Sequence, residues 1–216
     1  MTPQRFDVES ALERVRPGRP LIVVDADEVI LSFVAGFDSF LRAQDLFLDL
    51  STYALHGNVK RLADRQAVLD VEVTALLEEF RTELDGLELV EGAKEALSRL
   101  SEPADIVVLS NIAMEQGAAR QRNLGRLGVP FTLVCNNGPK GQSVKALGAR
   151  AGRPLFFIDD IPQHLASVAA LVPDARLIHL VGDERLKPIL PESRDAHLRA
   201  RDWKDAEAFM RRELGL

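Results

Sequence analysis

The sequence predicts an α/β fold, in which a parallel β-sheet is covered by helices on both faces. Two observations indicate this class. Short apolar runs, typical of buried strands, recur at residues 21–24, 105–109, 131–135, 155–158 and 176–181. Segments with apolar residues at helical spacing separate the later runs, and this alternation is typical of parallel sheets with right-handed crossovers.

The first strand has clear boundaries. Its residues, Leu21-Ile22-Val23-Val24, follow Pro20 and run directly into Asp25-Ala26-Asp27, so the apolar run stops at charged side chains. The next predicted element of the sheet layer is a helix at 91–100, which Pro103 ends before the strand at 105–109.

The rest of the chain repeats this alternation. Gly128 closes one predicted helix, and Pro154 stands just before one predicted strand. The remaining predicted helices are one at 114–127, one that begins at 140, one that ends at 171 and a last one at about 204–213. The remaining predicted strands are at 131–135, 155–158 and 176–181.

Residues 33–86 interrupt the alternation. Their apolar residues have helical spacing, and no run among them indicates a strand. We therefore expect a core formed by residues 1–32 and 87–216, with residues 33–86 as a helical cap inserted after the first strand. Such an insertion lies over the carboxyl end of the sheet, where it can close a site. His56 and Asn58, in a loop of this cap, are candidate substrate contacts.

Composition limits the possible partners and location. The chain has 216 residues, of which 46% are hydrophobic and 28% charged, as is usual for a globular protein. A net charge of -6 argues against a nucleic-acid partner. The first 19 residues are polar and are not expected to form a signal peptide, and no apolar run is long enough to suggest a membrane span. With one cysteine, Cys135, we expect a cytoplasmic protein. The oligomeric state stays open.

Polar side chains stand where the predicted strands end. In chain order they are Asp25 and Asp27, Ser110 and Asn111, Lys140, and Asp159 and Asp160. The carboxyl ends of parallel strands meet at one edge of the sheet, so these groups converge. Crowded carboxylates either share a proton or hold a metal ion. Carboxylates, an ammonium and a hydroxyl together suit metal-assisted phosphoryl transfer.

At these residues the chain resembles the haloacid dehalogenase (HAD) superfamily. The four segments that carry the resemblance are VVDADEVI, IVVLSN, Lys140 within GPKGQSVKAL, and LFFIDD, over a core of residues 20–181. The resemblance implies a Rossmann-like core and a C1-type cap. It also implies that Asp25 is the nucleophile and Asp27 the general acid and then base.

The resemblance further implies the roles of the other strand-end residues. Ser110, with Asn111 beside it, would bind the phosphoryl group, and Lys140 would stabilise its charge. The implied Mg²⁺ ligands are Asp25, the backbone carbonyl of Asp27, Asp159 and Asp160.

The residue at position 27 favours one reaction class. A leaving alkoxide needs a proton, which a carboxylic acid in reach can supply, and the superfamily's dehalogenases lack an acid at this position. We therefore expect a Mg²⁺-dependent phosphatase that acts on a small phosphorylated metabolite through an aspartyl-phosphate. Glu28 departs from the glycine found in many relatives and adds charge at the hinge.

Alternative interpretations remain open at this point. The protein could be a phosphotransferase, a mutase or a nucleotidase of the same superfamily, or a non-catalytic protein that binds a ligand or a partner. Lys145 competes with Lys140 for the cationic role. Ser110 and Asn111 could cap a helix, and Asp159 and Asp160 could be first-turn acids. The histidines at 164, 179 and 197 show no metal-ligand spacing and are expected to be structural or on the surface.

Overall fold

The computed structural model describes residues 5–216, and for residues 83–85 the backbone only; residues 1–4 of the predicted core therefore lie outside the described residues. At its centre is a sheet in the order β5-β4-β1-β6-β7-β8, in which each strand pairs in parallel with its neighbours. The strands are β1 (Leu21–Val24), β4 (Asp105–Ser110), β5 (Thr132–Cys135), β6 (Leu155–Asp159), β7 (Arg176–Leu180) and β8 (Leu198–Ala200). The predicted α/β class is confirmed.

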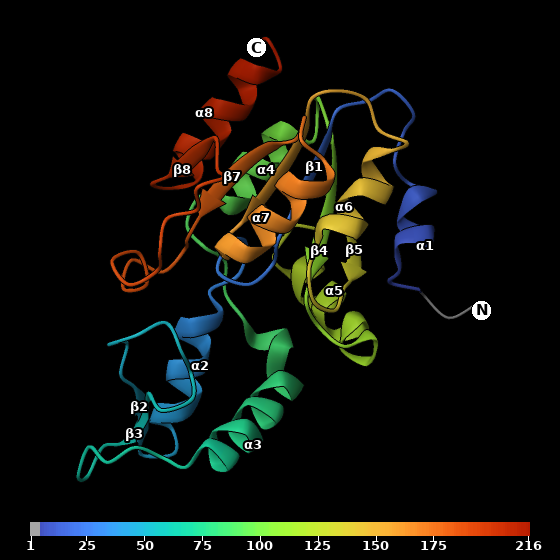
Figure 1. The fold of residues 1–216 in the computed structure, drawn as a ribbon. Coiled ribbons are helices and arrows are strands. Elements are labelled where there is room, and N and C mark those ends of the chain that lie inside the picture. The colour runs from blue at the N-terminus through green and yellow to red at the C-terminus, as the bar shows by residue number, and fades with distance from the viewer. Residues whose placement is uncertain (1–4) are drawn as a thin grey trace.

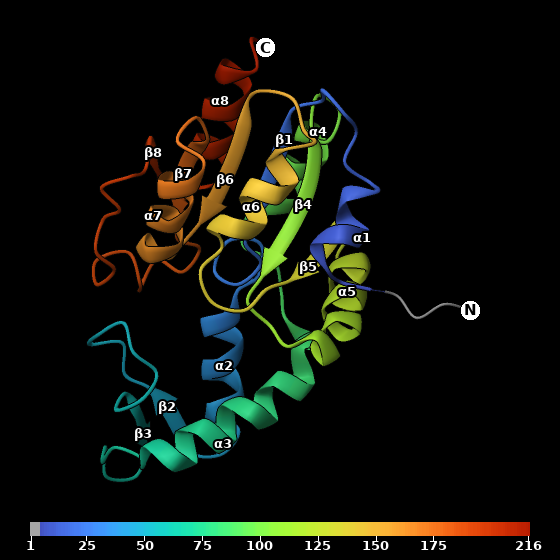
Figure 2. The same cartoon turned by 45° about the vertical axis from the view of Figure 1, so that its right-hand side comes forward.

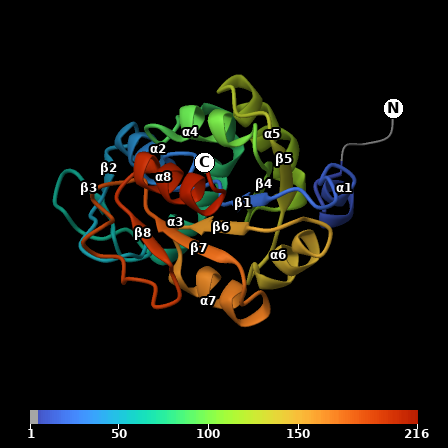
Figure 3. The same ribbon diagram turned by 90° about the horizontal axis from the view of Figure 1, so that it is seen from above.

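Helices cover both faces of this sheet, as Figure 3 shows from above. One face packs on α4 (Ala93–Leu100), α5 (Gly117–Arg126) and α8 (Trp203–Glu213), and the other packs on α1 (Val8–Leu12), α6 (Gly141–Gly148) and α7 (Pro162–Leu171). The side chains of β1 alternate between the two layers. Ile22 and Val24 belong to the first core, whereas Leu21 and Val23 belong to the second, which is why the strand is apolar throughout.

The segment between β1 and α4 forms a separate lobe at the carboxyl end of the sheet (Figures 1 and 2). It contains α2 (Phe33–Arg42), β2 (Leu46–Leu48), β3 (Val59–Arg61), α3 (Asp70–Phe80) and the 3₁₀ helix η1 (Arg81–Gly86). We call this lobe the cap. Phe33, Phe37 and Phe40 of α2 meet Phe80 of α3, with ring centroids 5.3–5.4 Å from that ring, so aromatic packing joins its two helices.

The cap is not entirely helical, contrary to the sequence-based expectation. β2 and β3 form an antiparallel ribbon, in which Leu46 is paired with Arg61 and Leu48 with Val59. Each strand has three residues, which is too short for an alternating pattern to stand out in the sequence.

The other differences concern short elements and boundaries. Helix α1 and strand β8 were not expected. The helix has only five residues and the strand only three. The predicted helix at 114–127 is divided into the 3₁₀ helix η2 (Met114–Gln116) and α5. Among the described residues, no helix combines the length and apolarity needed to cross a bilayer.

Candidate active site

The carboxyl ends of β1 and β6 bring three aspartates together. Asp25 follows β1 directly, and its backbone N–H donates to the carbonyl oxygen of Ile158 in β6 (2.9 Å). The three aspartates are Asp25, Asp159 and Asp160, and all are buried. Each offers one carboxylate oxygen, and these three oxygens lie within 4.8 Å of one another. Asp25 and Asp159 are therefore close enough to share an ion.

Lys140 lies between two of these carboxylates. Its Nζ is 2.6 Å from Oδ1 of Asp25 and 2.7 Å from Oδ2 of Asp159, and the side chain is fully buried. Burial alone would lower the pKa of this ammonium, but the two carboxylates outweigh it and raise the pKa above its usual value. Lys145, the competing lysine, is exposed on α6.

Crowding of buried carboxylates defines the electrostatics of the site. Burial raises the pKa of Asp25 and of Asp160, and the neighbouring aspartates raise both further. Burial acts in the same direction on Asp159, but Lys140 and His164 overcome it and lower the pKa of that carboxyl.

One lysine does not neutralise three carboxylates, so the site favours an additional cation. Three hard oxygen donors fit Mg²⁺, which commonly takes a few carboxylates and completes its shell with water or phosphate oxygens.

Asp27 makes a contact that the sequence did not suggest. Nη1 of Arg120, in α5, donates to Oδ1 of Asp27 (2.6 Å). The Arg120 side chain is fully buried, whereas that of Asp27 is 27% exposed. Asp27 therefore faces both the interior and the pocket described below.

Glu28 joins the core to the cap. Its backbone is left-handed (φ 59°), a conformation that favours glycine, and its side chain is buried. Oε1 accepts from the N–H of Val34 at the start of α2 (2.6 Å), and Oε2 accepts from the N–H of Asp183 after β7 (3.1 Å). These bonds offset the backbone strain and cap α2, which explains an acid at this position. Burial raises the pKa of Glu28 from its ordinary value of 4.5 to about 7.

These residues line a pocket of about 200 Å³ between core and cap. The core side is polar, whereas Phe33, Val34 and Leu55 make the cap side apolar. The lining residues are Asp25, Asp27, Glu28, Phe33, Val34, Tyr53, Leu55, Asn111, Lys140, Asp160, Ile161 and His164. The hydroxyl of Tyr53, in the loop between β2 and β3, donates to Oδ2 of Asp160 (3.2 Å), so the cap closes directly onto the aspartate cluster.

Ser110 and Asn111, expected to bind the phosphoryl group, differ in accessibility. Asn111 lines the pocket and accepts from Nδ2 of Asn136 (2.7 Å), which fixes its amide. The Ser110 hydroxyl is buried, and no hydrogen-bond partner for it occurs in the described part of the chain. Only the Asn111 side chain is therefore presented to the pocket.

The two candidate substrate contacts in the cap lie elsewhere. His56 is exposed and its Nε2 is 3.0 Å from Oγ1 of Thr74 in α3. Asn58 is buried and its Nδ2 donates to the hydroxyl of Thr52 (2.7 Å) and the carbonyl of Ala54 (2.8 Å). Asn58 thus shapes the loop that carries Tyr53, and neither residue lines the pocket.

Sequence reasoning missed three residues of the site. His164 was expected to be structural or on the surface, but its Nδ1 is 3.1 Å from Oδ1 of Asp159 and its Nε2 is 3.2 Å from Nδ2 of Asn111. Its position five residues after Asp159, in the first turn of the next helix, could have signalled this. Tyr53 and Arg120 are brought in by the cap loop and by α5, and no local motif marks either.

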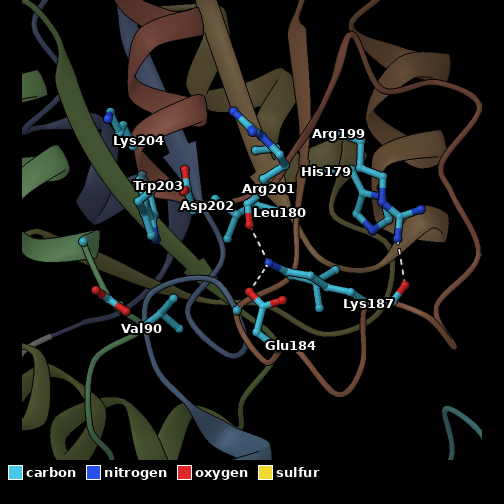
Figure 4. Close-up of a pocket in the computed structure, with 15 residues that line it drawn as sticks. Val90, His179, Leu180, Glu184, Lys187, Arg199, Arg201, Asp202, Trp203 and Lys204 are labelled. Carbon is cyan, nitrogen blue, oxygen red and sulfur yellow. Dashed lines mark hydrogen bonds and ion pairs between the residues drawn. The ribbon is translucent and has the colours of Figure 1, made fainter.

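A larger hollow, of about 760 Å³, lies at the β7–β8 edge beside the first turns of α4 and α8 (Figure 4). Its basic side chains are largely neutralised. Lys187 donates to Glu184 and to the backbone carbonyl of Arg201, as the dashed lines show, and Arg199 pairs with Glu192 (2.8 Å). Because it lacks a cluster of unbalanced charge, this hollow is a poorer candidate for catalysis than the aspartate pocket.

Comparison with known proteins identifies the fold. No protein-family model matches the sequence, and neither does any curated protein sequence. Among solved structures, an L-2-haloacid dehalogenase is 15% identical, with a TM-score of 0.60 over 89% of this chain and 100% of that one. The chain has the haloacid dehalogenase-like hydrolase fold. The Rossmann-like core expected from the four motifs is confirmed.

Two further structures with this fold were solved with ligands. A HAD-family hydrolase from Deinococcus radiodurans with bound phosphate and sodium is 18% identical, with a TM-score of 0.59 over 92% of this chain and 97% of that one. A HAD hydrolase from Bacillus subtilis bound to magnesium is 14% identical, with a TM-score of 0.59 over 89% and 99%. At these identities the likeness is one of fold, so the chemistry is argued from the residues of the pocket.

Proposed function

We propose that this HAD-fold protein is a Mg²⁺-dependent phosphatase that acts on a small phosphorylated metabolite. The observation that carries the proposal is the arrangement of Asp25, Lys140 and the two acids after β6. A carboxylate at the end of β1 lies 2.6 Å from a buried ammonium and beside an oxygen-donor site for a hard cation. The single half-buried Cys135 and the net charge of -6 support a cytoplasmic protein without a nucleic-acid partner.

Substrate binding is expected to depend on the polar core side of the pocket. Lys140 neutralises phosphoryl charge, and Asn111, whose amide is held by Asn136, Gly138 and His164, lines the side of the pocket on which the phosphate would lie. When bound at Asp25, Asp159 and Asp160, Mg²⁺ supplies positive charge that offsets the repulsion between the carboxylate and the phosphate. A volume of about 200 Å³ and the apolar side chains of the cap favour a small substrate.

Two aspartates then perform the reaction. Oδ of Asp25 forms a bond to phosphorus while the bond from phosphorus to the leaving oxygen breaks, and Asp27 gives that oxygen its proton. In the second half Asp27 takes a proton from water, whose oxygen bonds to phosphorus as the Asp25–phosphorus bond breaks. Phosphate leaves and Asp25 is regenerated.

A panel of phosphorylated metabolites, assayed for phosphate release with Mg²⁺ and with EDTA, tests this proposal. We expect Mg²⁺-dependent release from at least one small phosphate ester and its loss in Asp25→Asn, which is nearly isosteric with the native residue. Isomerisation without release would indicate a mutase, and halide release from 2-haloacids would indicate a dehalogenase. Either outcome, or release that persists in Asp25→Asn, would contradict the proposal.

A further inference from the structure

The side chain of Arg120 is an unusual feature of the core behind the pocket. It is fully buried, and it reaches across 93 residues of sequence to Asp27, with 2.6 Å between Nη1 and Oδ1. In the described part of the chain its Nε and Nη2 have no hydrogen-bond partner. A guanidinium does not deprotonate in proteins, and a buried charge without a counter-ion is costly. In the free enzyme the Asp27 carboxylate is therefore the group that compensates this charge, and the proton that Asp27 gives to the leaving oxygen has to enter with the phosphate ester, as its monoanion.

The helix that carries Arg120 is firmly placed. Gly117, at its start, lies so close to Phe6 that an added Cβ would be 2.4 Å from that ring. Further along, Nδ2 of Asn123 donates to the carbonyl of Leu87, where the chain returns from the cap (3.0 Å). Because α5 is held at both points and the Arg120 side chain is fully buried, the guanidinium has a defined place in the core.

The ion pair divides the Asp27 carboxylate between two environments. Arg120 has no exposed surface, so the oxygen it binds faces the interior. The exposed part of the side chain is then what faces the pocket that Asp27 lines. A proton donor must lie within hydrogen-bond reach of the leaving oxygen, and a misplacement of about 1 Å can cost about 100-fold in rate.

We propose that Arg120 is a positioning residue, which fixes the rotamer of Asp27 so that its free oxygen reaches the leaving group. This inference rests on the proposed phosphatase function. Arg120 does not touch substrate, and it acts only through the orientation of Asp27.

The test compares two leaving groups in Arg120→Met. An alkyl phosphate, glycerol 2-phosphate, needs a proton on its leaving oxygen, whereas p-nitrophenyl phosphate releases a stable phenolate without one. We expect kcat/KM to fall about 100-fold for glycerol 2-phosphate and to change little for p-nitrophenyl phosphate. Slow hydrolysis of the phosphorylated enzyme should also produce a burst of p-nitrophenolate. A purely structural role would lower kcat/KM equally for both substrates, and that result would overturn the proposal.

Three further variants serve as controls. Arg120→Lys keeps the charge and one donor, so it should recover part of the loss with glycerol 2-phosphate. Arg122→Met, at an exposed position of the same helix, should not discriminate between the substrates. In an Asp27→Asn background, Arg120→Met should cause no further loss of kcat/KM. A further loss there would show that Arg120 acts independently of Asp27 and would contradict the inference.

Thermal unfolding tests the Arg120–Asp27 ion pair by a measurement that does not depend on the proposed phosphatase function. Asp27→Asn leaves a buried guanidinium without a counter-ion, so it should melt at a lower temperature than the double variant Asp27→Asn/Arg120→Met. If the wild-type protein released no phosphate from any ester, the proposed function would fail while this comparison still measured the ion pair. If the double variant melted at or below Asp27→Asn, the coupling on which the inference rests would be absent.

Discussion

At the scale of single residues, Lys140 determines whether the acidic pocket can exist without a metal ion. It contacts both Asp25 and Asp159 and has no exposed surface. A surface lysine gains little from such pairs, whereas a buried one compensates charges that water cannot reach.

Replacement of Lys140 by methionine should therefore affect stability as well as catalysis. We expect the metal-free variant to lose about 3–5 kcal/mol of unfolding free energy, because two buried carboxylates lose their partner. Mg²⁺ should restore part of this loss. Urea denaturation with Mg²⁺ and with EDTA measures both effects. Lys145→Met, at an exposed position of α6, is the matched control. A metal-free Lys140→Met protein as stable as wild type would contradict this interpretation.

Glu28 should give stability a specific pH dependence. Its pKa is 4.5 in the unfolded chain and about 7 in the folded protein, where burial holds the proton more tightly. Its contribution to stability is therefore fully present below pH 4.5 and is lost as the pH rises through 7. The difference between the two pKa values corresponds to about 3 kcal/mol.

Glu28→Gln removes this titration and keeps one acceptor for the cap helix. The fall in unfolding free energy between pH 5 and pH 7 should be smaller in the variant than in wild type, as chemical denaturation at several pH values would show. Asp25 and Asp160 titrate in both proteins, so the difference between the two slopes reports the charge that forms at Glu28, together with its effect on the neighbouring Asp160. Equal slopes would argue against a raised pKa at this position.

At the scale of elements, the loop between β2 and β3 is the part of the cap that reaches the aspartate cluster. Asn58 holds it from inside, and Tyr53 projects from it to Asp160. Burial and the neighbouring Asp160 carboxylate raise the pKa of Tyr53, so the hydroxyl stays protonated and acts as a donor. The loop thus provides a direct contact between the cap and the acids that could hold a metal ion.

Removal of this hydroxyl should loosen closure without removing the reacting groups. We expect Tyr53→Phe to raise KM about tenfold, which corresponds to the loss of one hydrogen bond to a charged group, while kcat changes little. Steady-state kinetics on the best phosphate ester measures both constants. His56→Ala is the control on the same loop, because His56 contacts Thr74 and does not line the pocket. If KM rose equally in both variants, the Tyr53 contact would not be what closes the cap.

The sequence predicted some elements better than others, for physical reasons. Strands β1 and β6 are buried on both faces, so they read as continuous apolar runs, and their ends placed Asp25 and Asp159 correctly at one edge. The β2–β3 ribbon has no such run. Tyr53 and Arg120 reach the site through tertiary packing, and they are 107 and 93 residues away from their partners in the sequence. Local sequence patterns do not indicate contacts over such separations.

At the scale of the whole molecule, the parallel sheet explains why distant residues form one pocket. Strands β4, β1 and β6 are neighbours at its centre, and their carboxyl ends face the cap. Each core motif contributes one kind of group: a carboxylate after β1, an amide after β4, an ammonium at the start of α6 and two acids at the end of β6. The cap adds apolar walls and one hydroxyl. The fold thus concentrates negative charge where a cation and a phosphate can balance it.

The central claim is that the carboxylate of Asp25 attacks phosphorus, and covalent labelling tests it most directly. The enzyme would be mixed with Mg²⁺ and p-nitrophenyl phosphate, quenched in acid within milliseconds and reduced with borohydride, which converts an aspartyl-phosphate to homoserine. Peptide mass spectrometry then locates the modified residue. We expect the change at Asp25 in wild type and its absence in Asp25→Asn. Phosphate release without modification of Asp25, or with modification of another residue, would contradict the account.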